Sequence, residues 1–411
     1  MRINKLLIAA AVVTGAAFAA SAQQTSPYSK FGYGILGDNA TSAQRQMGGV
    51  GYAMNSGRQI NVMNPASYAA SDSLTFLFDM GIDLTKYNRK DEAGSTSDFG
   101  GGLDYLTLQF PVTRYLGVSA GLLPYSSVGY AFGNEIKNGS MSHQGSGGIN
   151  QIYLGVGGTP FKNFRLGANI SYLFGTTYND VYATTNSSSS ALFEQVMEIK
   201  DYHLLFGAQY SVNISPKNRV SVGLTYSPSK TLLGHTYVQK YIVGSTAAPD
   251  TVAYEKLKGN FSLPSTWGFG VNYEWNRRLL VEADFTYQNW GSAKFRQIEN
   301  FSATELCNRW KVGLGASFTP DPRGGYFKRM TYRAGGFFNH DYIKVNGNNV
   351  REYGLSCGFA FPSHSSKTEI NLGFEYRHRQ AHPNPLLKED YFNITLGVNF
   401  NQLWFFQNKI R

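Results

Sequence analysis

Carboxylates and cations recur at every second position of several runs that are otherwise apolar. Glu282 and Asp284, for example, alternate with Val281, Ala283 and Phe285. Such charges in the middle of a strand could bind the carboxylate of a ligand, and the candidate contacts are Arg309, Lys311 and Arg333. They could instead neutralise one another, which we favour because an unpaired charge in a crowded interior is costly. The charged residues on this predicted face are Asp79, Asp83, Glu274, Glu282, Asp284, Glu369, Glu375, Arg165, Arg309, Lys311, Arg333, Arg377 and Arg379.

Other kinds of chemistry find little support in the spacing of residues. The histidines include one loose pair, His378 and His382, which lacks the spacing of a metal site. No serine and histidine pattern of a hydrolase stands out. The glycines within 48–51 lack both the preceding strand and the Lys-Ser/Thr ending of a phosphate-binding loop. We therefore expect a non-enzyme with no catalytic residues, no metal and no cofactor.

The charged positions must be held by β-strands. Side chains of a strand point alternately to opposite faces, so each alternating run has one polar and one apolar face. Near the C-terminus, Phe392, Ile394 and Leu396 alternate with Asn393 and Thr395. A soluble sandwich would bury the apolar face against a second sheet, whereas a transmembrane barrel would turn it toward lipid and keep a polar interior. The remainder of the chain favours the all-β transmembrane barrel.

Turn signals between these runs predict about fourteen antiparallel strands, an even number as in bacterial barrels. Short turns at 113–114, 159–162, 215–218 and 276–278 alternate with long loops at 124–146, 179–195, 232–263 and 291–305. This alternation is typical of short periplasmic turns and longer external loops. The predicted strands are centred on 73–87, 102–113, 115–123, 147–158, 163–178, 196–213, 219–231, 264–275, 279–290, 306–319, 328–340, 350–361, 368–380 and 390–402.

The tryptophans lie near the ends of the predicted strands. Trp267, Trp290 and Trp310 fall at external ends, and Trp275 and Trp404 fall at periplasmic ends. Because amphipathic rings collect at the two headgroup levels of a membrane, we expect all five to form aromatic girdles.

The N-terminal residues and the overall composition place the chain in an exported class. Residues 1–22 resemble a secretory signal peptide, with Arg2 and Lys5 before an apolar stretch and a small-residue cleavage site at 20–22. No later stretch approaches the roughly 20 apolar residues of a membrane helix.

Cys307 and Cys357 fall on non-neighbouring predicted strands and are not expected to pair. The formal charge of +10 is scattered without a basic run, so we expect no nucleic-acid partner. We expect these cations to pair with lumenal carboxylates and with anionic headgroups of outer-membrane lipid.

Residues 23–72 lack the strand pattern and precede the predicted barrel, which spans 73–411. Because an empty barrel of this size would leak, we expect this segment to fold into the lumen as a hatch. Gly48, Gly49 and Gly51 would let the hatch backbone pack closely. Asn64 could cap a turn at Pro65 and Ala66, because proline fixes its own backbone and restricts the residue before it.

The third predicted strand contains a candidate break. Pro124 cannot donate to a β-ladder, and Gly129 weakens a strand or marks a bulge. If both lie within the membrane, then Pro124, Ser126, Ser127 and Gly129 border a lateral opening in the wall. Alternatively, Pro124 simply begins the external loop.

Several motifs, in this order along the chain, resemble those of the FadL-like outer-membrane transporters of long-chain fatty acids and aromatic hydrocarbons. They are Met47–Ala53 with Asn64–Ala66, Leu263–Pro264 with Trp267–Gly270, Gln288–Ser292 and Tyr332–Gly336. Ser26–Gly34 also resembles the start of Bacteroidetes members. The resemblance implies a fourteen-stranded barrel with an N-terminal hatch, a hydrophobic ligand in the lumen, and release into the bilayer beside a kinked strand. The predicted outer loops contain no long apolar groove that would catch a fatty chain.

Two functions follow as expectations. The first is passive uptake of small hydrophobic, fatty-acid-like molecules through a plugged lumen, with outer-membrane lipid and the ligand as partners and barrel-assembly machinery needed for insertion. The alternative is a non-transporting barrel that docks a protein, like the shuttle protein of the type IX secretion system. A passive structural barrel is a third reading. Deletion of residues 24–60 should leave a folded barrel that conducts ions if the segment is a plug.

Overall fold

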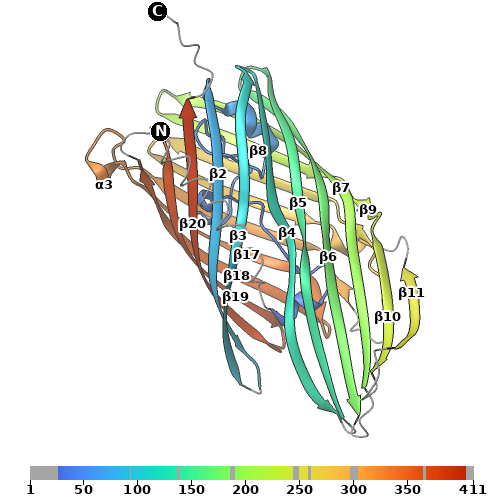
Figure 1. Cartoon of the computed structure of the whole chain (residues 1–411). Coiled ribbons are helices and arrows are strands. Elements are labelled where there is room, and N and C mark those ends of the chain that lie inside the picture. The colour runs from blue at the N-terminus through green and yellow to red at the C-terminus, as the bar shows by residue number, and fades with distance from the viewer. Residues whose placement is uncertain are drawn as a thin grey trace, which may run out of the picture.

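A computed structural model describes residues 26–92, 94–136, 139–185, 190–243, 250–257, 261–296, 304–363 and 367–403. Within these ranges, fourteen antiparallel strands form a closed barrel (Figure 1). The ring closes where β2 pairs with β20 along its whole length. The wall strands are β2 (Thr75–Lys90), β3 (Ser95–Thr113), β4 (Leu116–Ile136), β5 (Gly139–Phe161), β6 (Phe164–Thr185), β7 (Ser190–Ser215), β8 (Asn218–Ser227), β13 (Thr266–Trp275), β14 (Leu279–Gln288), β16 (Arg309–Phe318), β17 (Thr331–Val345), β18 (Asn348–Pro362), β19 (Glu369–His382) and β20 (Lys388–Leu403).

The alternation of side chains sets which face of the wall points inward. In β16, Trp310, Val312 and Leu314 are exposed on the outside, whereas Arg309 and Lys311 are buried on the inside. The same alternation recurs along the other wall strands, so an apolar band surrounds a polar lumen, as in transmembrane barrels. A sheet that closes on itself and exposes its apolar face excludes the soluble sandwich.

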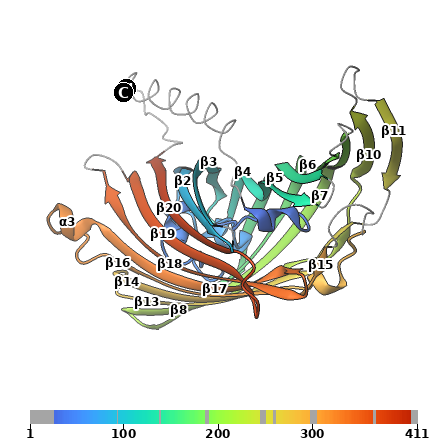
Figure 2. The same ribbon diagram turned by 90° about the horizontal axis from the view of Figure 1, so that it is seen from below.

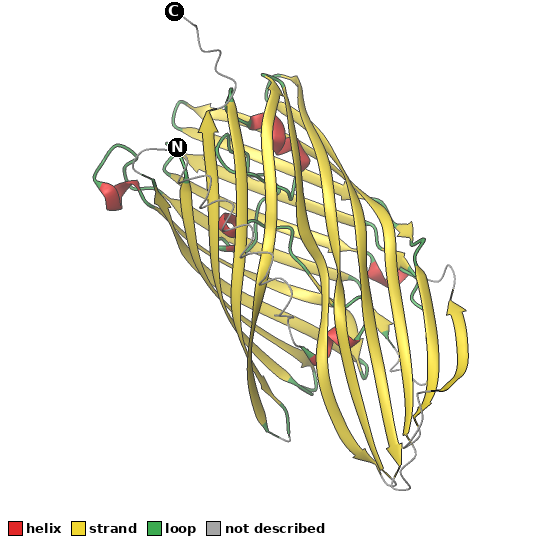
Figure 3. Ribbon diagram, viewed as in Figure 1, coloured by secondary structure: helices red, strands yellow, loops and turns green. Residues whose placement is uncertain are grey.

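All fourteen predicted strands are present, but several are much longer than predicted (Figure 3). The predicted loops 124–146 and 179–195 are wrong, because β4 and β5 stay paired as far as Ile136 and Gly139, and β6 and β7 as far as Thr184 and Ser190. Small and polar residues dominate these extensions, so the sequence there lacks the alternating apolar pattern that predicts a strand. The strands are nevertheless paired through their backbone groups. Residues 137–138 and 186–189, which fall within these predicted loops, lie outside the described ranges.

The predicted loop 232–263 also contains strands. β10 (His235–Val243) continues the sheet by pairing with β7, and β11 (Asp250–Leu257) pairs with β10. Figure 2 shows this hairpin standing away from the barrel. The remaining short strands are β1 (Ile35–Leu36), β9 (Lys230–Thr231), β12 (Ser262–Leu263) and β15 (Glu305–Leu306).

Three of the five tryptophans occupy the positions expected for an aromatic girdle. Trp267, Trp275 and Trp310 are exposed on the outside of the wall near strand ends. Trp290 is a correction, because the 3-10 helix η3 (Trp290–Ser292) places it in the interior, fully buried against Tyr33 and Tyr342. Trp404 lies outside the described residues, and Cys307 and Cys357 are free.

Residues 26–72, called the N-terminal segment below, run through the interior of the barrel (Figures 1 and 2). The segment contains the 3-10 helix η1 (Pro27–Lys30), β1, the short helix α2 (Ser42–Arg45) and the 3-10 helix η2 (Pro65–Ala70). A further short helix, α3 (Tyr326–Arg329), lies in the turn before β17. No helix in the described ranges is long and apolar enough to span a membrane.

Candidate functional site

The wall has a discontinuity between β3 and β4. Their ladder runs from Thr113 and Leu116 only to Leu106 and Leu122. Beyond that point β3 remains paired with β2 and β4 remains paired with β5, so the two strands separate (Figure 1). The facing edges of β3 from Ser95 and of β4 to Ile136 therefore lack each other as partners.

The N-terminal segment takes part of the edge of β4 that β3 leaves. Ile35 and Leu36 pair antiparallel with Ser127 and Ser126, and because β5 occupies the other edge of β4, β1 must lie on the vacated one. The Gly37 N–H donates to the Tyr125 carbonyl at 2.8 Å.

A second contact lies just beyond β1 on the same edge. The Ser26 N–H donates to the Gly129 carbonyl at 2.6 Å, and the Gly129 N–H donates to Ser29 Oγ at 3.0 Å. Two parts of the segment, through backbone groups and the Ser29 hydroxyl, thus satisfy backbone groups of β4 that would otherwise lack a partner.

The structure brings together the four residues predicted at a lateral opening. Pro124, Ser126, Ser127 and Gly129 all lie in β4 where the N-terminal segment contacts it. The register of β4 against β5 shifts between Pro124 and Ser126, which leaves Tyr125 as the extra residue of a bulge. Pro124 therefore lies inside a strand and does not begin the external loop.

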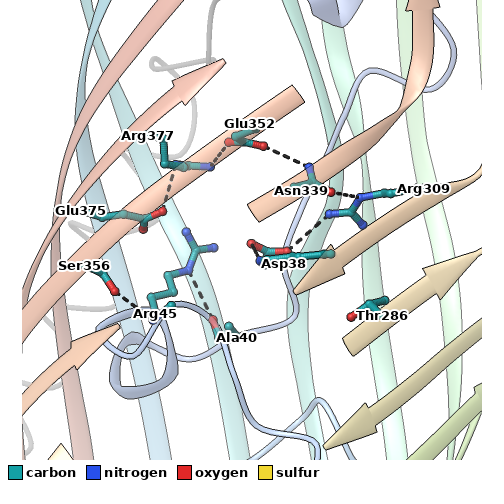
Figure 4. Close-up of polar contacts among 12 residues, drawn as sticks. Asp38, Ala40, Arg45, Thr286, Arg309, Asn339, Glu352, Ser356, Glu375 and Arg377 are labelled. Carbon is teal, nitrogen blue, oxygen red and sulfur yellow. Dashed lines mark hydrogen bonds and ion pairs between the residues drawn. The ribbon is translucent and has the colours of Figure 1, made fainter. Parts of the chain in front are cut away.

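A chain of charged and amide groups runs along the inner face of the neighbouring strands β16 to β19 and meets the N-terminal segment at Asp38 (Figure 4). The Asp38 carboxylate lies 2.8 Å from Lys311 Nζ and 3.8 Å from Arg309 Nη2. Arg309 Nε donates to Asn339 Oδ1 at 3.0 Å, and Asn339 Nδ2 donates to Glu352 Oε2 at 3.2 Å. Asp38 thus ties the N-terminal segment to β16 and, through Asn339, to β17 and β18.

The network continues along β18 and β19. Glu352 pairs with Arg379 at 3.0 Å and with Arg377 at 3.7 Å, and Arg377 also lies 3.0 Å from Glu375. The second tie to the N-terminal segment is Arg45, whose guanidinium lies 2.5 Å from the Asp104 carboxylate in β3. These contacts pair lumenal charges within the protein itself.

Asp38 remains ionised although it lies inside the barrel. Burial alone would raise the pKa of its carboxyl, but Lys311 and Arg309 outweigh burial and hold that pKa well below its usual range. A third of the side chain stays accessible, because Asp38 faces a cavity of about 110 Å³. The cavity lies between the N-terminal segment and the wall and is lined by Leu36, Asp38, Tyr125, His203, Arg309 and Lys311, among others.

The predicted hatch glycines lie where the N-terminal segment approaches the wall. Gly48 and Gly49 both have φ of +73°, a left-handed conformation that favours glycine. A Cβ on Gly48 would lie 2.7 Å from the Gly336 carbonyl oxygen. The Gly51 N–H donates to Asp284 Oδ2 at 2.6 Å. Each glycine therefore permits a close contact or a turn.

Asn64, Pro65 and Ala66 form the start of η2. Asn64 Oδ1 accepts a hydrogen bond from the Ala66 N–H at 3.1 Å, which caps the helix, and Pro65 occupies its first turn. Asn64 Nδ2 donates to the Ala208 carbonyl in β7 at 3.2 Å. These residues attach the segment to the wall.

The wall itself is shaped to receive the N-terminal segment. Inward-facing glycines line the path of its backbone, and a Cβ at any of them would collide with it. Beside η2, Gly157 and Gly167 would meet Pro65; beside α2, Gly315 and Gly335 would meet Met47. The close fit extends over opposite sides of the barrel.

The three candidate carboxylate contacts separate into two places. Arg309 and Lys311 lie together at Asp38. Arg333 lies elsewhere, where Nη1 donates to Asn371 Oδ1 at 2.6 Å and to Gln46 Oε1 at 3.1 Å. Within the described ranges no group of three or more His, Cys, Asp or Glu side chains could hold a metal ion.

The barrel shares its fold with channels of known structure. The toluene transporter TodX of P. putida aligns with a TM-score of 0.61 and 14% identity over 90% of this chain and 100% of that one. The toluene transporter TbuX of Ralstonia pickettii gives 0.60 and 14% over 88% and 98%. A FadL homologue of Pseudomonas aeruginosa gives 0.63 and 12% over 89% and 99%. The predicted FadL-like fold is confirmed.

Sequence comparison assigns the family. No curated protein matches the chain. The family model for BamG, however, matches residues 2–411. The protein, with its FadL-like barrel, therefore belongs to the BamG family.

Proposed function

We propose that this protein is an outer-membrane channel for passive uptake of small hydrophobic, fatty-acid-like molecules, exported by the signal sequence at residues 1–22. The observation that carries the proposal is the edge of β4 that β3 leaves and the N-terminal segment occupies. Because β1 is not one of the fourteen strands of the closed ring, it can leave this edge without breaking the barrel. The fold shared with toluene transporters and a FadL homologue supports a transport role.

In this proposal the N-terminal segment is the hatch. The segment crosses the interior of the barrel. Its β1 pairs with β4, its Asp38 forms an ion pair with Lys311 of β16, and its η2 packs closely against Gly157 and Gly167 of the wall. Movement of residues 26–37 away from β4 would uncover the bulge at Tyr125 and open a path between β3 and β4 into the bilayer. Pro124, Ser126, Ser127 and Gly129 would border that lateral exit.

The ligand would act on the hatch through Asp38. A fatty-acid carboxylate entering the adjoining cavity would compete with Asp38 for Lys311 and Arg309. Because Asp38 lies two residues after the end of β1 at Leu36, loss of its ion pairs would loosen β1 on β4 and favour the open arrangement. Arg333 already donates hydrogen bonds to Gln46 and Asn371. We therefore place the ligand carboxylate at Lys311 and Arg309, the partners of Asp38.

Uptake of radiolabelled oleate tests the proposal. The full-length protein would be expressed in a Gram-negative host that lacks its own fatty-acid channel, with an inserted unrelated barrel as the control. We expect a faster initial uptake than in the control. Uptake equal to the control, with the protein folded in the outer membrane, would contradict the transport role.

Protein docking is the second candidate function. It is favoured by the hairpin of β10 and β11, which continues the sheet beyond the wall and gives β11 only β10 as a partner among the described strands. Exposed strand edges can pair with a strand of another protein, and the name of the BamG family points to a link with outer-membrane assembly. Removing 236–256 should abolish docking and leave oleate uptake unchanged, so the two functions are separable.

A further inference from the structure

A second cavity lies far from the Asp38 network, at the end of the barrel that carries the short turns. It measures about 560 Å³ and is bounded by the ends of β6, β7, β8 and β13 and by the turns between them. The lining includes Arg165, Ser211, Lys217, Arg219, Glu274 and Arg277. This volume is typical of a pocket for a small molecule.

The charge of this pocket is unbalanced. Four cations line it, Arg165, Lys217, Arg219 and Arg277, against the single carboxylate of Glu274. Glu274 lies 3.7 Å from Arg219 Nη1 and so accounts for one of the four. An excess of positive charge remains for an anion.

The guanidinium of Arg165 has nitrogens that lack a partner in the described part of the chain. Its Nε and Nη1 are buried and have no hydrogen-bond partner among the described residues. The neighbouring Arg219 carries a charge of the same sign and so cannot serve as its partner. Buried donors are almost always satisfied, so two unsatisfied nitrogens on one guanidinium indicate a ligand that the protein alone does not supply.

The donor types point to phosphate chemistry. Arginine presents several N–H donors in a planar fork that matches phosphate oxygens, and the serine hydroxyls and asparagine amides around it can donate to the remaining oxygens. A phosphate monoester carries a charge of about −1.5 to −2 at pH 7, which suits the excess of cations better than one carboxylate does.

We propose that this pocket binds a phosphate group, with Arg165 as the central contact and Lys217, Arg219 and Arg277 around it. The pocket lies at the end of the barrel that carries the short turns, which in transmembrane barrels faces the periplasm. The phosphate is therefore either free or esterified in solution, or part of the headgroup of an inner-leaflet lipid. The pocket shares no lining residue with the cavity at Asp38. It does not depend on the transport role.

Calorimetric titration of the full-length protein in uncharged detergent tests the site. Inorganic phosphate and, separately, short-chain dihexanoyl phosphatidic acid, whose headgroup is a phosphate monoester, would be titrated at constant ionic strength. We expect saturable binding of one phosphate group per chain. Arg165→Gln should weaken it by about tenfold or more, because a charge-assisted hydrogen bond is lost. Lys162→Gln, in the neighbouring turn but outside the pocket, should leave the affinity unchanged.

The outcomes separate the sources of the phosphate. Tighter binding of the lipid than of inorganic phosphate, lost in Arg165→Gln, would identify a headgroup; binding of inorganic phosphate alone would identify a soluble ligand. If Arg165→Gln fails to fold, Lys217→Gln in the exposed turn replaces it and should weaken binding several-fold. No saturable binding, equal binding by the pocket variants, or binding of hexaglutamate without competition by phosphate would each overturn the proposal.

Discussion

Ile35 of the N-terminal segment pairs in antiparallel register with Ser127 of β4, on the edge from which β3 has separated. At Ser126 and Ser127, the edge of β4 is therefore covered by β1 of the N-terminal segment, which is not one of the fourteen wall strands. A short two-residue strand with few ladder bonds opens more readily than the long strands around it. The proposed transport function depends on the opening of this pairing.

The first prediction concerns the ion pair of Asp38. In Asp38→Asn, Lys311 and Arg309 lose their counter-ion in the lumen, where each keeps only 9% of its side chain exposed. We expect the N-terminal segment to be held more weakly by about 2 kcal/mol, after allowing for the partial exposure of Asp38. Planar-bilayer recordings should show more frequent or larger ion currents.

Asp321→Asn is the matched control for this variant. Asp321 lies 3.6 Å from Arg278 at the short-turn end of the barrel, and both side chains are well exposed. Its currents should equal those of the unchanged protein. Equal currents in Asp38→Asn would show that Asp38 does not hold the segment.

The second prediction concerns the fit between segment and wall. A Cβ on Gly335 would overlap the backbone of Met47 and Gly48, so Gly335→Ala should displace the segment at a cost of about 1–3 kcal/mol. Trypsin should then cleave faster after Arg45. Gly102→Ala is the control, because no atom lies within 4 Å of the added methyl group. Similar cleavage rates in both variants would argue against a close fit at Gly335.

The third prediction concerns pH and Lys30 in η1. Burial lowers the pKa of the Lys30 ammonium from 10.5 to about 8. Between these two values the unfolded chain binds the proton and the folded chain does not, so stability rises as pH increases from about 8 to 10.5. Below pH 8 both states are protonated, and the slope from this group disappears.

Lys30→Met isolates this effect, because it keeps a long side chain and removes the titrating group. Urea unfolding of the segment can be followed by fluorescence of Trp290, which is fully buried beside Tyr33. The difference in midpoint between the two proteins should change between pH 8 and 10.5 and stay constant from pH 6 to 7.5. A difference that stays constant up to pH 10.5 would refute the shifted pKa.

Alternation was sufficient to predict the wall, because a half-buried strand must repeat every second residue wherever it lies. The lengths of β4 to β7 were not predictable in this way, since above the apolar band small polar residues face both sides and the pattern disappears. Trp290 was misplaced because its neighbours continue a strand pattern, whereas η3 turns the chain inward only after Gln288.

Local sequence patterns could not predict which residues hold the N-terminal segment in the barrel. Asp38 and Lys311 are separated by 273 positions, and nothing near Asp38 indicates a lumenal partner. Arg309 and Lys311 were identified as cations of the inner face, yet sequence alone could not tell a partner in the protein from one in a ligand. Pro124 did mark the bulge, because proline lacks the N–H that a regular ladder needs.

A reversible cross-link across the β1–β4 pairing tests the central claim most directly. Direct partners in antiparallel strands have Cα atoms within the range of a disulfide. Ile35→Cys with Ser127→Cys would be made in a protein whose Cys307 and Cys357 are serine, and Val271→Cys with Ala283→Cys, partners on β13 and β14, would serve as the control.

The measurement is the initial rate of oleate uptake before and after reduction of the cross-link. If the N-terminal segment must leave β4 for the ligand to pass, the oxidised Ile35–Ser127 variant should lose uptake, reduction should restore it, and the control pair should transport in both states. Undiminished uptake with the cross-link fully formed would contradict the account.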